Sequence, residues 1–152
     1  MYIIQKPKKS LGQNFLIDKN IINKIIEVGN INQNKCIIEI GPGNGNLTEN
    51  IITKKPKKII AIEKDYKLSF FLKNKFKNYK KIKIINKDIL ESIDKSYSEK
   101  NITIFGNLPY NISTKILVLF ILLKKWPPFY DSLILMFQKE VADRIIAKNK
   151  TK

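Results

Sequence analysis

Short apolar runs alternate with longer amphipathic stretches along most of the chain. The apolar runs predict β-strands over residues 36–40, 58–63, 82–85, 102–106 and 132–137. Helical spacing of apolar residues predicts helices over residues 19–28, 46–54, 66–76, 112–123 and 139–148. Strands that alternate with helices form parallel sheets joined by right-handed crossovers. The pattern therefore predicts an α/β fold with a mostly parallel sheet and helices on both faces.

The ends of the predicted helices carry local signals. Asp18 and Asp65 precede two of the helices as N-caps, and Gly29 follows the first helix as its stop. In the last helix Val141, Ile145 and Ile146 recur on the apolar face, which we expect to point into the core.

Few side chains are available for acid–base or metal chemistry. The chain has no histidine and one cysteine, Cys36, which excludes a histidine-based triad, an internal disulfide and a Cys/His zinc cluster, and we expect no bound metal. No apolar stretch approaches the roughly 20 residues of a membrane span, and the first residues lack the apolar core of a secretory signal. We therefore expect a cytoplasmic protein without a membrane partner.

The net charge of +16 favours a polyanionic partner, because lysines that face phosphates release condensed counterions. Among the 29 basic residues only Arg144 is an arginine. Arginine reads phosphate and base edges better than lysine does, and Asn and Ile are also abundant, so a biased genome is the alternative explanation of the charge.

A glycine loop follows the first predicted strand, with glycines at positions 41, 43 and 45 after Glu39. Glycines there allow backbone amides to approach a ligand at the start of a helix. A dinucleotide loop needs G-x-G-x-x-G or A, but Asn46 follows Gly45. The alternating glycines instead suit a nucleoside with an amino-acid tail.

Acidic residues end the next two predicted strands. Glu63 lies 22 residues after Gly41, where a carboxylate can accept hydrogen bonds from both hydroxyls of a ribose. Asp88 follows the third strand and can accept from an adenine amino group, with Ile89 against the ring. Taken singly, each carboxylate is better explained as a surface cap or turn residue, but acidic or glycine sites at three successive strand ends favour a common function.

The segment Asn107-Leu108-Pro109-Tyr110 follows the fourth predicted strand. It combines an amide, an aromatic ring and a proline-fixed backbone at a strand end, where ligands sit in open α/β sheets. These residues predict a binding site for a flat, amine-bearing substrate. The alternative is a strand-to-helix turn with a buried tyrosine.

Together these motifs resemble, in order and spacing, those of the ribosomal RNA adenine dimethyltransferase family. The matching segments are Gly12-Gln13-Asn14-Phe15-Leu16, Glu39-Ile40-Gly41-Pro42-Gly43-Asn44-Gly45-Asn46-Leu47-Thr48, Glu63, Asp88, Asn107-Leu108-Pro109-Tyr110 and Gln138-Lys139-Glu140-Val141-Ala142-Asp143-Arg144. The resemblance implies a Rossmann-like, S-adenosylmethionine-dependent enzyme. It also implies the reaction, which is dimethylation of the N6 amino groups of two adjacent adenosines near the 3′ end of small-subunit ribosomal RNA.

The resemblance also implies site residues. Those expected to bind S-adenosylmethionine are Asn14, Leu16, Gly41, Gly43, Glu63, Asp88, Ile89 and Asn107. Asn14 and Leu16 would close over the methionine end, Glu63 would hold the ribose, and Asp88 would bind the adenine.

The expected catalytic residues are Asn107, Leu108, Pro109 and Tyr110. The side-chain oxygen of Asn107 and the carbonyl of Leu108, directed by Pro109, accept hydrogen bonds from the target amine and pull it towards tetrahedral geometry. Tyr110 stacks on the base. Alignment with the sulfonium methyl then supplies most of the acceleration, and no histidine is needed.

Members of this family continue beyond the position of Lys152 with two more strands and a helical domain that helps to hold RNA. We therefore expect residues 1–152 to form an incomplete methyltransferase domain, monomeric, with small-subunit ribosomal RNA or the immature small subunit as partner. One alternative is the related large-subunit methyltransferase of the macrolide-resistance type. Another is a non-catalytic RNA-binding assembly factor.

Overall fold

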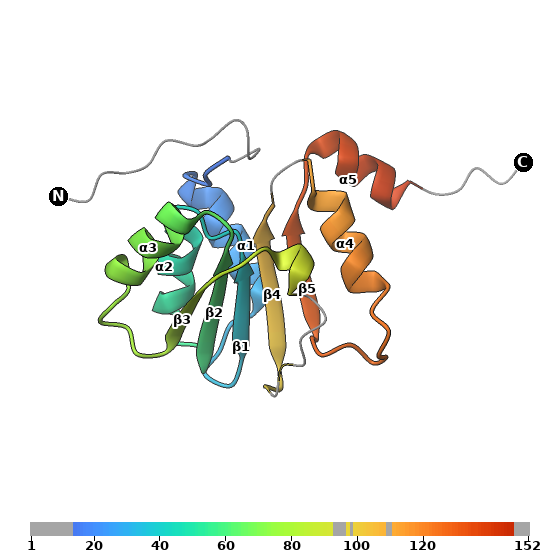
Figure 1. Ribbon diagram of the computed structural model, residues 1–152. Coiled ribbons are helices and arrows are strands. Elements are labelled where there is room, and N and C mark those ends of the chain that lie inside the picture. Colours follow the sequence, from blue (N-terminus) through green and yellow to red (C-terminus); the bar gives the residue numbers. More distant parts are fainter. Residues whose placement is uncertain (1–13, 93–96, 98, 109–110, 148–152) are drawn as a thin grey trace, which may run out of the picture.

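Five parallel strands form one sheet at the centre of the molecule (Figure 1). The computed structural model describes residues 14–92, 97, 99–108 and 111–147. The strands are β1 (Cys36–Ile40), β2 (Lys58–Glu63), β3 (Ile82–Asn86), β4 (Ile102–Asn107) and β5 (Ser132–Met136). Their order is β3-β2-β1-β4-β5. The chain thus winds outward from β1 to one edge and then returns to the other side of β1 with β4.

Helices cover both faces of this sheet (Figure 1). They are α1 (Lys19–Gly29), α2 (Asn46–Thr53), α3 (Tyr66–Lys75), a 3-10 turn η2 (Ile89–Glu91), α4 (Ser113–Ile121) and α5 (Lys139–Ile146). Ile37 and Ile59 share a core with α1 and α2, whereas Ile38 and Ile60 share one with α4 and η2. Neighbouring residues of a strand point to opposite faces, so each central strand contributes to both cores. The predicted α/β fold is confirmed.

The central strands are more deeply buried than the edge strands. Every residue of β1 is buried, and β4 is buried up to Gly106. The edge strands β3 and β5 are half-buried, and Lys83 of β3 is exposed. Central strands of a parallel sheet are covered on both faces, which explains their nearly continuous apolar sequences.

Two local predictions are wrong. Gly29 is the last residue of α1, and it is Asn30 that takes the left-handed conformation (φ 42°). A Cβ on Gly29 would lie 2.3 Å from Cζ of Phe105, so the glycine permits close packing of α1 on β4. In α5, Ile145 and Ile146 are 45% and 76% exposed and do not point into the core.

The N-caps are as predicted. One carboxylate oxygen of Asp18 accepts from the backbone N–H groups of Asn20 and Ile21, and Asp65 does the same for Lys67 and Leu68. No helix within the described part of the chain is both long and apolar enough to span a membrane.

Candidate functional site

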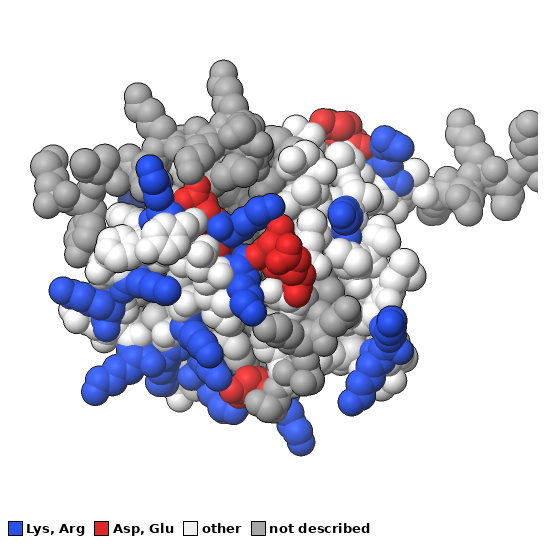
Figure 2. Space-filling view, in the orientation of Figure 1, with Lys and Arg blue, Asp and Glu red and all other residues white. Residues whose placement is uncertain are grey.

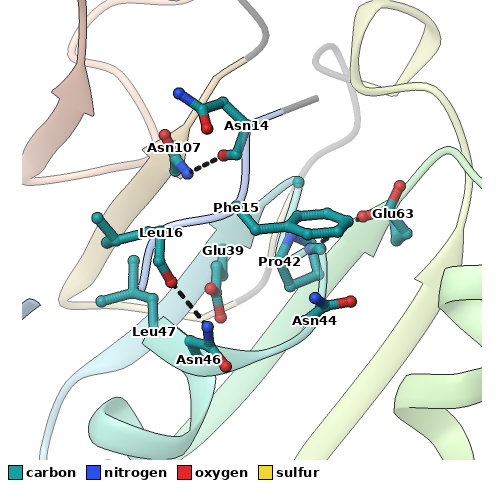
Figure 3. Close-up of a pocket in the computed structure, with 12 residues that line it drawn as sticks. Asn14, Phe15, Leu16, Glu39, Pro42, Asn44, Asn46, Leu47, Glu63 and Asn107 are labelled. Carbon is teal, nitrogen blue, oxygen red and sulfur yellow. Dashed lines mark hydrogen bonds between the residues drawn. The ribbon is translucent and has the colours of Figure 1, made fainter. Parts of the chain in front are cut away.

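The candidate site lies at the carboxyl ends of β1, β2 and β4 (Figure 3). This is where the strand order reverses, the position at which open α/β sheets bind ligands. A small cavity here is lined by residues that the sequence analysis singled out and by several that it did not. The lining residues are Asn14, Phe15, Leu16, Glu39, Gly41, Pro42, Gly43, Asn44, Asn46, Leu47, Glu63 and Asn107.

The loop after β1 turns on three glycines, Gly41, Gly43 and Gly45, with φ values of 64°, 58° and 78°. Side chains with a Cβ rarely adopt these values, which is why the positions are glycine. Among the described residues, the atom nearest to a Cβ on Gly41 would be the Asn107 carbonyl oxygen at 3.8 Å. The part of the chain that the structure describes therefore leaves the space above Gly41 open to a ligand.

Glu63 ties the end of β2 to the glycine loop. The backbone N–H of Gly43 donates to its Oε2 (3.1 Å), and the N–H of Asp65 donates to its Oε1 (2.9 Å). Burial raises the pKa of Glu63, and the two backbone hydrogen bonds act against that rise. Each carboxylate oxygen keeps accepting capacity, so the side chain is held in place and can still bind a hydroxyl.

Glu39 is a cavity residue that was not predicted as part of the site. It lies in the middle of buried β1 and is 1% exposed, and the Thr48 hydroxyl donates to its Oε2 (2.7 Å). Burial raises the pKa of Glu39 to about 7, although the Thr48 hydrogen bond lowers it and the Glu63 charge adds to the rise. An acidic residue inside an otherwise apolar strand was the signal that could have identified it.

The segment from Asn14 to Leu16 crosses the glycine loop and is anchored by two side-chain amides (Figure 3). Asn107 Nδ2 donates to the Asn14 carbonyl (2.8 Å), and Asn46 Nδ2 donates to the Leu16 carbonyl (2.7 Å). This hydrogen bond fixes the orientation of the Asn107 amide, whose oxygen is the side chain's acceptor. Asn14, Leu16 and Asn107 are thus brought together as predicted, and Asn46 was missed.

Phe15 narrows the cavity. Its ring lies against the loop, where a Cβ on Gly43 would be 2.8 Å from its Cδ1. In Figure 3 the ring points towards Glu63, above Pro42. A ligand seated on Gly43 therefore requires the Phe15 ring to turn aside.

A second cavity of about 260 Å³ continues from the first, because both are lined by Gly41 and Glu63. Asp88 and Ile89, which the sequence analysis assigns to the cofactor adenine, line this second cavity. Asp88 Oδ1 accepts from the Leu90 N–H (3.0 Å), and its Oδ2 pairs with Lys64 (2.8 Å). Burial raises the pKa of Asp88, but the hydrogen bonds from Lys64 and Leu90 outweigh it, and the pKa is lowered.

The structure reaches the predicted catalytic segment as far as Leu108. The Leu108 side chain is buried in the core with Ile116, which fixes the end of β4. Pro109 and Tyr110, like Gly12 and Gln13 of the N-terminal motif, lie outside the described residues. Among the residues that are described, no cluster of three or more His, Cys, Asp or Glu side chains could hold a metal ion.

A groove beside Asn107 adds apolar surface to the site. It is lined by the segment from Asn14 to Asp18, by Ile21, and by Met136 and Phe137 after β5. Asn107 lines both this groove and the cavity on the glycine loop, as do Asn14, Phe15 and Leu16.

The chain is similar to known proteins of one family. The sequence model of the family described as ribosomal RNA adenine dimethylase matches residues 4–152. The chain is 54% identical over 143 residues to "Ribosomal RNA small subunit methyltransferase A" of Pelagibacter ubique, which covers 94% of this chain and 53% of that protein. It is 47% identical over 146 residues to the protein of the same name from Bartonella quintana, with 92% and 52% covered. The chain thus spans about half the length of these curated relatives.

Solved structures show the same fold. A dimethyladenosine transferase from Plasmodium falciparum superposes with a TM-score of 0.73 at 28% identity, covering 89% of this chain and 47% of that one. The 23S rRNA methyltransferase ErmE superposes with a TM-score of 0.74 at 25% identity, covering 86% of this chain and 50% of that one. The Rossmann-like methyltransferase fold is confirmed, and the chain belongs to the ribosomal RNA adenine dimethylase family.

Proposed function

We propose that this chain carries the catalytic domain of an enzyme that transfers methyl groups from S-adenosylmethionine to the N6 amino groups of two adjacent adenosines in small-subunit ribosomal RNA. The observation that carries the proposal is the position of Asn107. It borders the glycine-loop cavity on one side and an apolar groove on the other, with its amide nitrogen held by Asn14. Its oxygen can therefore accept a hydrogen bond from the amino group of a base that lies in the groove, with that amino group facing a cofactor in the cavity.

The residues present fit S-adenosylmethionine. Gly41 leaves open space above the loop, and Glu63 offers fixed acceptors for the ribose hydroxyls. The adenine would lie in the second cavity, with Asp88 accepting from its amino group and Ile89 against its face. Asn14 and Leu16 would cover the methionine end, and Gly43 would lie beneath the cofactor once Phe15 turns aside. When bound, this cofactor supplies an electrophilic methyl group on a sulfonium.

The chain activates the amine by accepting its hydrogens. An adenine amine is a poor nucleophile because its lone pair is delocalised into the ring. The Asn107 oxygen and the Leu108 carbonyl are the proposed acceptors that draw its two N–H groups out of the ring plane. The proton leaves to water after transfer, because the methylated intermediate is strongly acidic. Alignment, and not a strong base, then lowers the barrier.

The target base must leave its stack to reach Asn107, at a cost of a few kcal/mol. Stacking on Tyr110, worth roughly 1–3 kcal/mol, is proposed to offset much of that cost. Phe137 lines the groove that also contains Asn107, which supports a place for Phe137 on the opposite face of the base.

The small subunit is the favoured target because the relatives that are 54% and 47% identical carry that name, whereas the 23S enzyme ErmE is 25% identical. We propose that the protein acts as a monomer in the cytoplasm, on the immature small subunit. A non-catalytic assembly factor is disfavoured, because such a protein has no need of a Glu63 carboxylate fixed by the glycine loop or of open space above Gly41.

The test is mass spectrometry of small-subunit RNA after incubation of immature subunits with S-adenosylmethionine and a full-length version of this chain. We expect dimethyladenosine with the wild-type protein and none with Asn107→Ala, since the variant loses the first acceptor. Isothermal calorimetry supplies the control, in which Asn107→Ala binds the cofactor within about tenfold of wild type. Undiminished transfer by Asn107→Ala would overturn the proposed mechanism.

A further inference from the structure

One side of the molecule carries a concentrated positive charge. Residues 66–87 contain eight lysines and no acidic residue, which is +8 of the net charge of +16. They form α3, the connection after it and the edge strand β3, and we call their exposed surface the α3–β3 face. Lysine side chains project from the left and lower-left parts of Figure 2, where Figure 1 places these two elements.

Most of this charge has no acidic partner. Lys75 is the exception, since it donates to the Asn44 carbonyl (2.7 Å) and pairs with Glu49 (3.1 Å). The other seven lysines of the stretch are exposed and make no ion pair among the residues that the structure describes. Repulsion between them remains uncompensated in the free protein and would be relieved by a polyanion.

Three of these lysines converge in a hollow. Lys80, Lys81 and Lys83 line it together with Lys57 and Lys58 at the amino-terminal ends of β2 and β3. Lys57 and Lys58 are paired with Glu99 (3.2 and 2.8 Å), which leaves the other three as the unpaired charges. The hollow is at the opposite end of the strands from Asn107, so it is separate from the cavity on the glycine loop.

The outer surface of α3 adds aromatic rings to the lysines. Tyr66 and Phe70 are 71% and 59% exposed and lie one turn apart, and Lys73 follows on the same side of the helix. The opposite side of α3 is buried through Leu68 and Leu72. Exposed rings beside lysines are the combination that binds unpaired nucleotides, because rings stack on bases while lysines meet phosphates.

We infer that the α3–β3 face is a second RNA-binding surface, in which Lys80, Lys81 and Lys83 contact the phosphate backbone and Tyr66 and Phe70 stack on unpaired bases. The inference rests on the proposed function in taking RNA as the substrate. An acidic protein segment would satisfy the lysines but gives no role to two exposed rings, so RNA accounts for more of the surface.

The test compares two variants with the same change of charge. Lys81→Glu/Lys83→Glu alters the α3–β3 face, and Lys124→Glu/Lys125→Glu alters exposed lysines after α4, on the other side of the molecule (Figure 1). Fluorescence anisotropy measures binding of a labelled single-stranded RNA from the 3′ end of small-subunit rRNA across a salt series. We expect the first variant to bind at least about tenfold more weakly and its salt slope to fall by about 1.4, the value for two lost phosphate contacts on a single strand.

Equal weakening by both variants would show that only net charge matters and would overturn the inference. Unchanged RNA binding by Lys81→Glu/Lys83→Glu would overturn it as well. Lys81→Gln/Lys83→Gln, which adds no negative charge, repeats the comparison if the glutamate variant unfolds.

A second pair of measurements tests the rings. Tyr66→Ala/Phe70→Ala removes two stacking contacts, so it is expected to weaken single-stranded RNA binding by at least roughly 30-fold and to leave duplex RNA binding unchanged, because duplex bases are not free to stack. Equal loss of affinity for both RNAs, or no loss, would show that the two rings do not stack on unpaired bases. S-adenosylmethionine calorimetry and methyl transfer by the wild-type chain test the proposed function independently, so failure of either one leaves the RNA-binding comparison readable.

Discussion

Glu63 and Asp88 stand at the ends of the neighbouring strands β2 and β3, and both are proposed to hold the same cofactor, yet their surroundings differ. Glu63 is buried, is held by two backbone N–H donors, and has a raised pKa. Asp88 has a lowered pKa and is held by one backbone N–H, that of Leu90, and by Lys64, whose side chain is 63% exposed. The carboxylate in the interior of the site is thus positioned by main chain alone, and the carboxylate at the rim partly by a solvent-exposed ion pair. Interior substitutions should therefore cost more.

The largest effect is expected at Glu63. Glu63→Ala removes the acceptor of two backbone N–H groups, so we expect at least about 100-fold weaker cofactor binding and a free energy of unfolding lower by about 2–5 kcal/mol. Calorimetry and urea unfolding measure the two quantities. Glu63→Gln is the matched control. Its cofactor affinity and its free energy of unfolding should lie between those of Glu63→Ala and wild type, because one acceptor oxygen remains. Wild-type binding by Glu63→Ala would contradict the proposed ribose site.

Glu39 is a second buried carboxyl of the site interior, and its effect on the stability of the protein is expected to depend on pH. A carboxyl whose pKa is higher in the folded protein takes up a proton on folding, so the folded state loses stability as pH rises from the unfolded pKa to the folded one. For Glu39 that window runs from 4.5 to about 7. Glu39→Gln lacks this titration and should gain about 3 kcal/mol relative to wild type across the window. Chemical unfolding at several pH values measures it, and a pH-independent difference would contradict the assignment.

Gly41 and Gly43 provide a comparison within the loop. Alanine at either position is strained by its positive φ, at a cost of roughly 1–2 kcal/mol in unfolding free energy. At Gly43 the new methyl group meets Phe15, whereas at Gly41 it enters space that the described residues leave open. We therefore expect Gly41→Ala to lose cofactor affinity about tenfold or more beyond its effect on stability. Equal losses of stability and unchanged cofactor affinity would show that the ligand does not lie over Gly41.

The smallest effect is expected at the rim. Asp88→Asn removes the ion pair with Lys64, and we expect about tenfold weaker cofactor binding with a slight loss of stability that salt reduces. Because the pKa of Asp88 is lowered, its contribution to stability is present above the unfolded pKa and disappears as pH falls through the folded one. Unfolding at neutral and acidic pH measures this, and a difference that grows towards acid would be the wrong sign.

Much of the site could be predicted because its residues lie at the ends of the apolar runs that form the strands. Gly41, Glu63 and Asp88 each follow the apolar run of a strand, and parallel strands bring such positions to one edge of a sheet. Two features were less accessible from the sequence. Glu39 was not assigned to the site, because an acid in mid-strand is read as a strand residue. Gly29 was read as a helix stop, because its contact with Phe105 is 76 residues away in sequence.

The sequence by itself determined the order of the elements, the positions that must be glycine and the acidic residues at the strand ends, because these depend on local backbone preference and on the period of apolar residues. The tertiary structure alone decided which groups face one another. The hydrogen bond from Asn107 to Asn14 joins residues 93 apart, and Phe15 lies on Gly43 for the same reason. Such contacts follow from how layers pack, which no local pattern encodes.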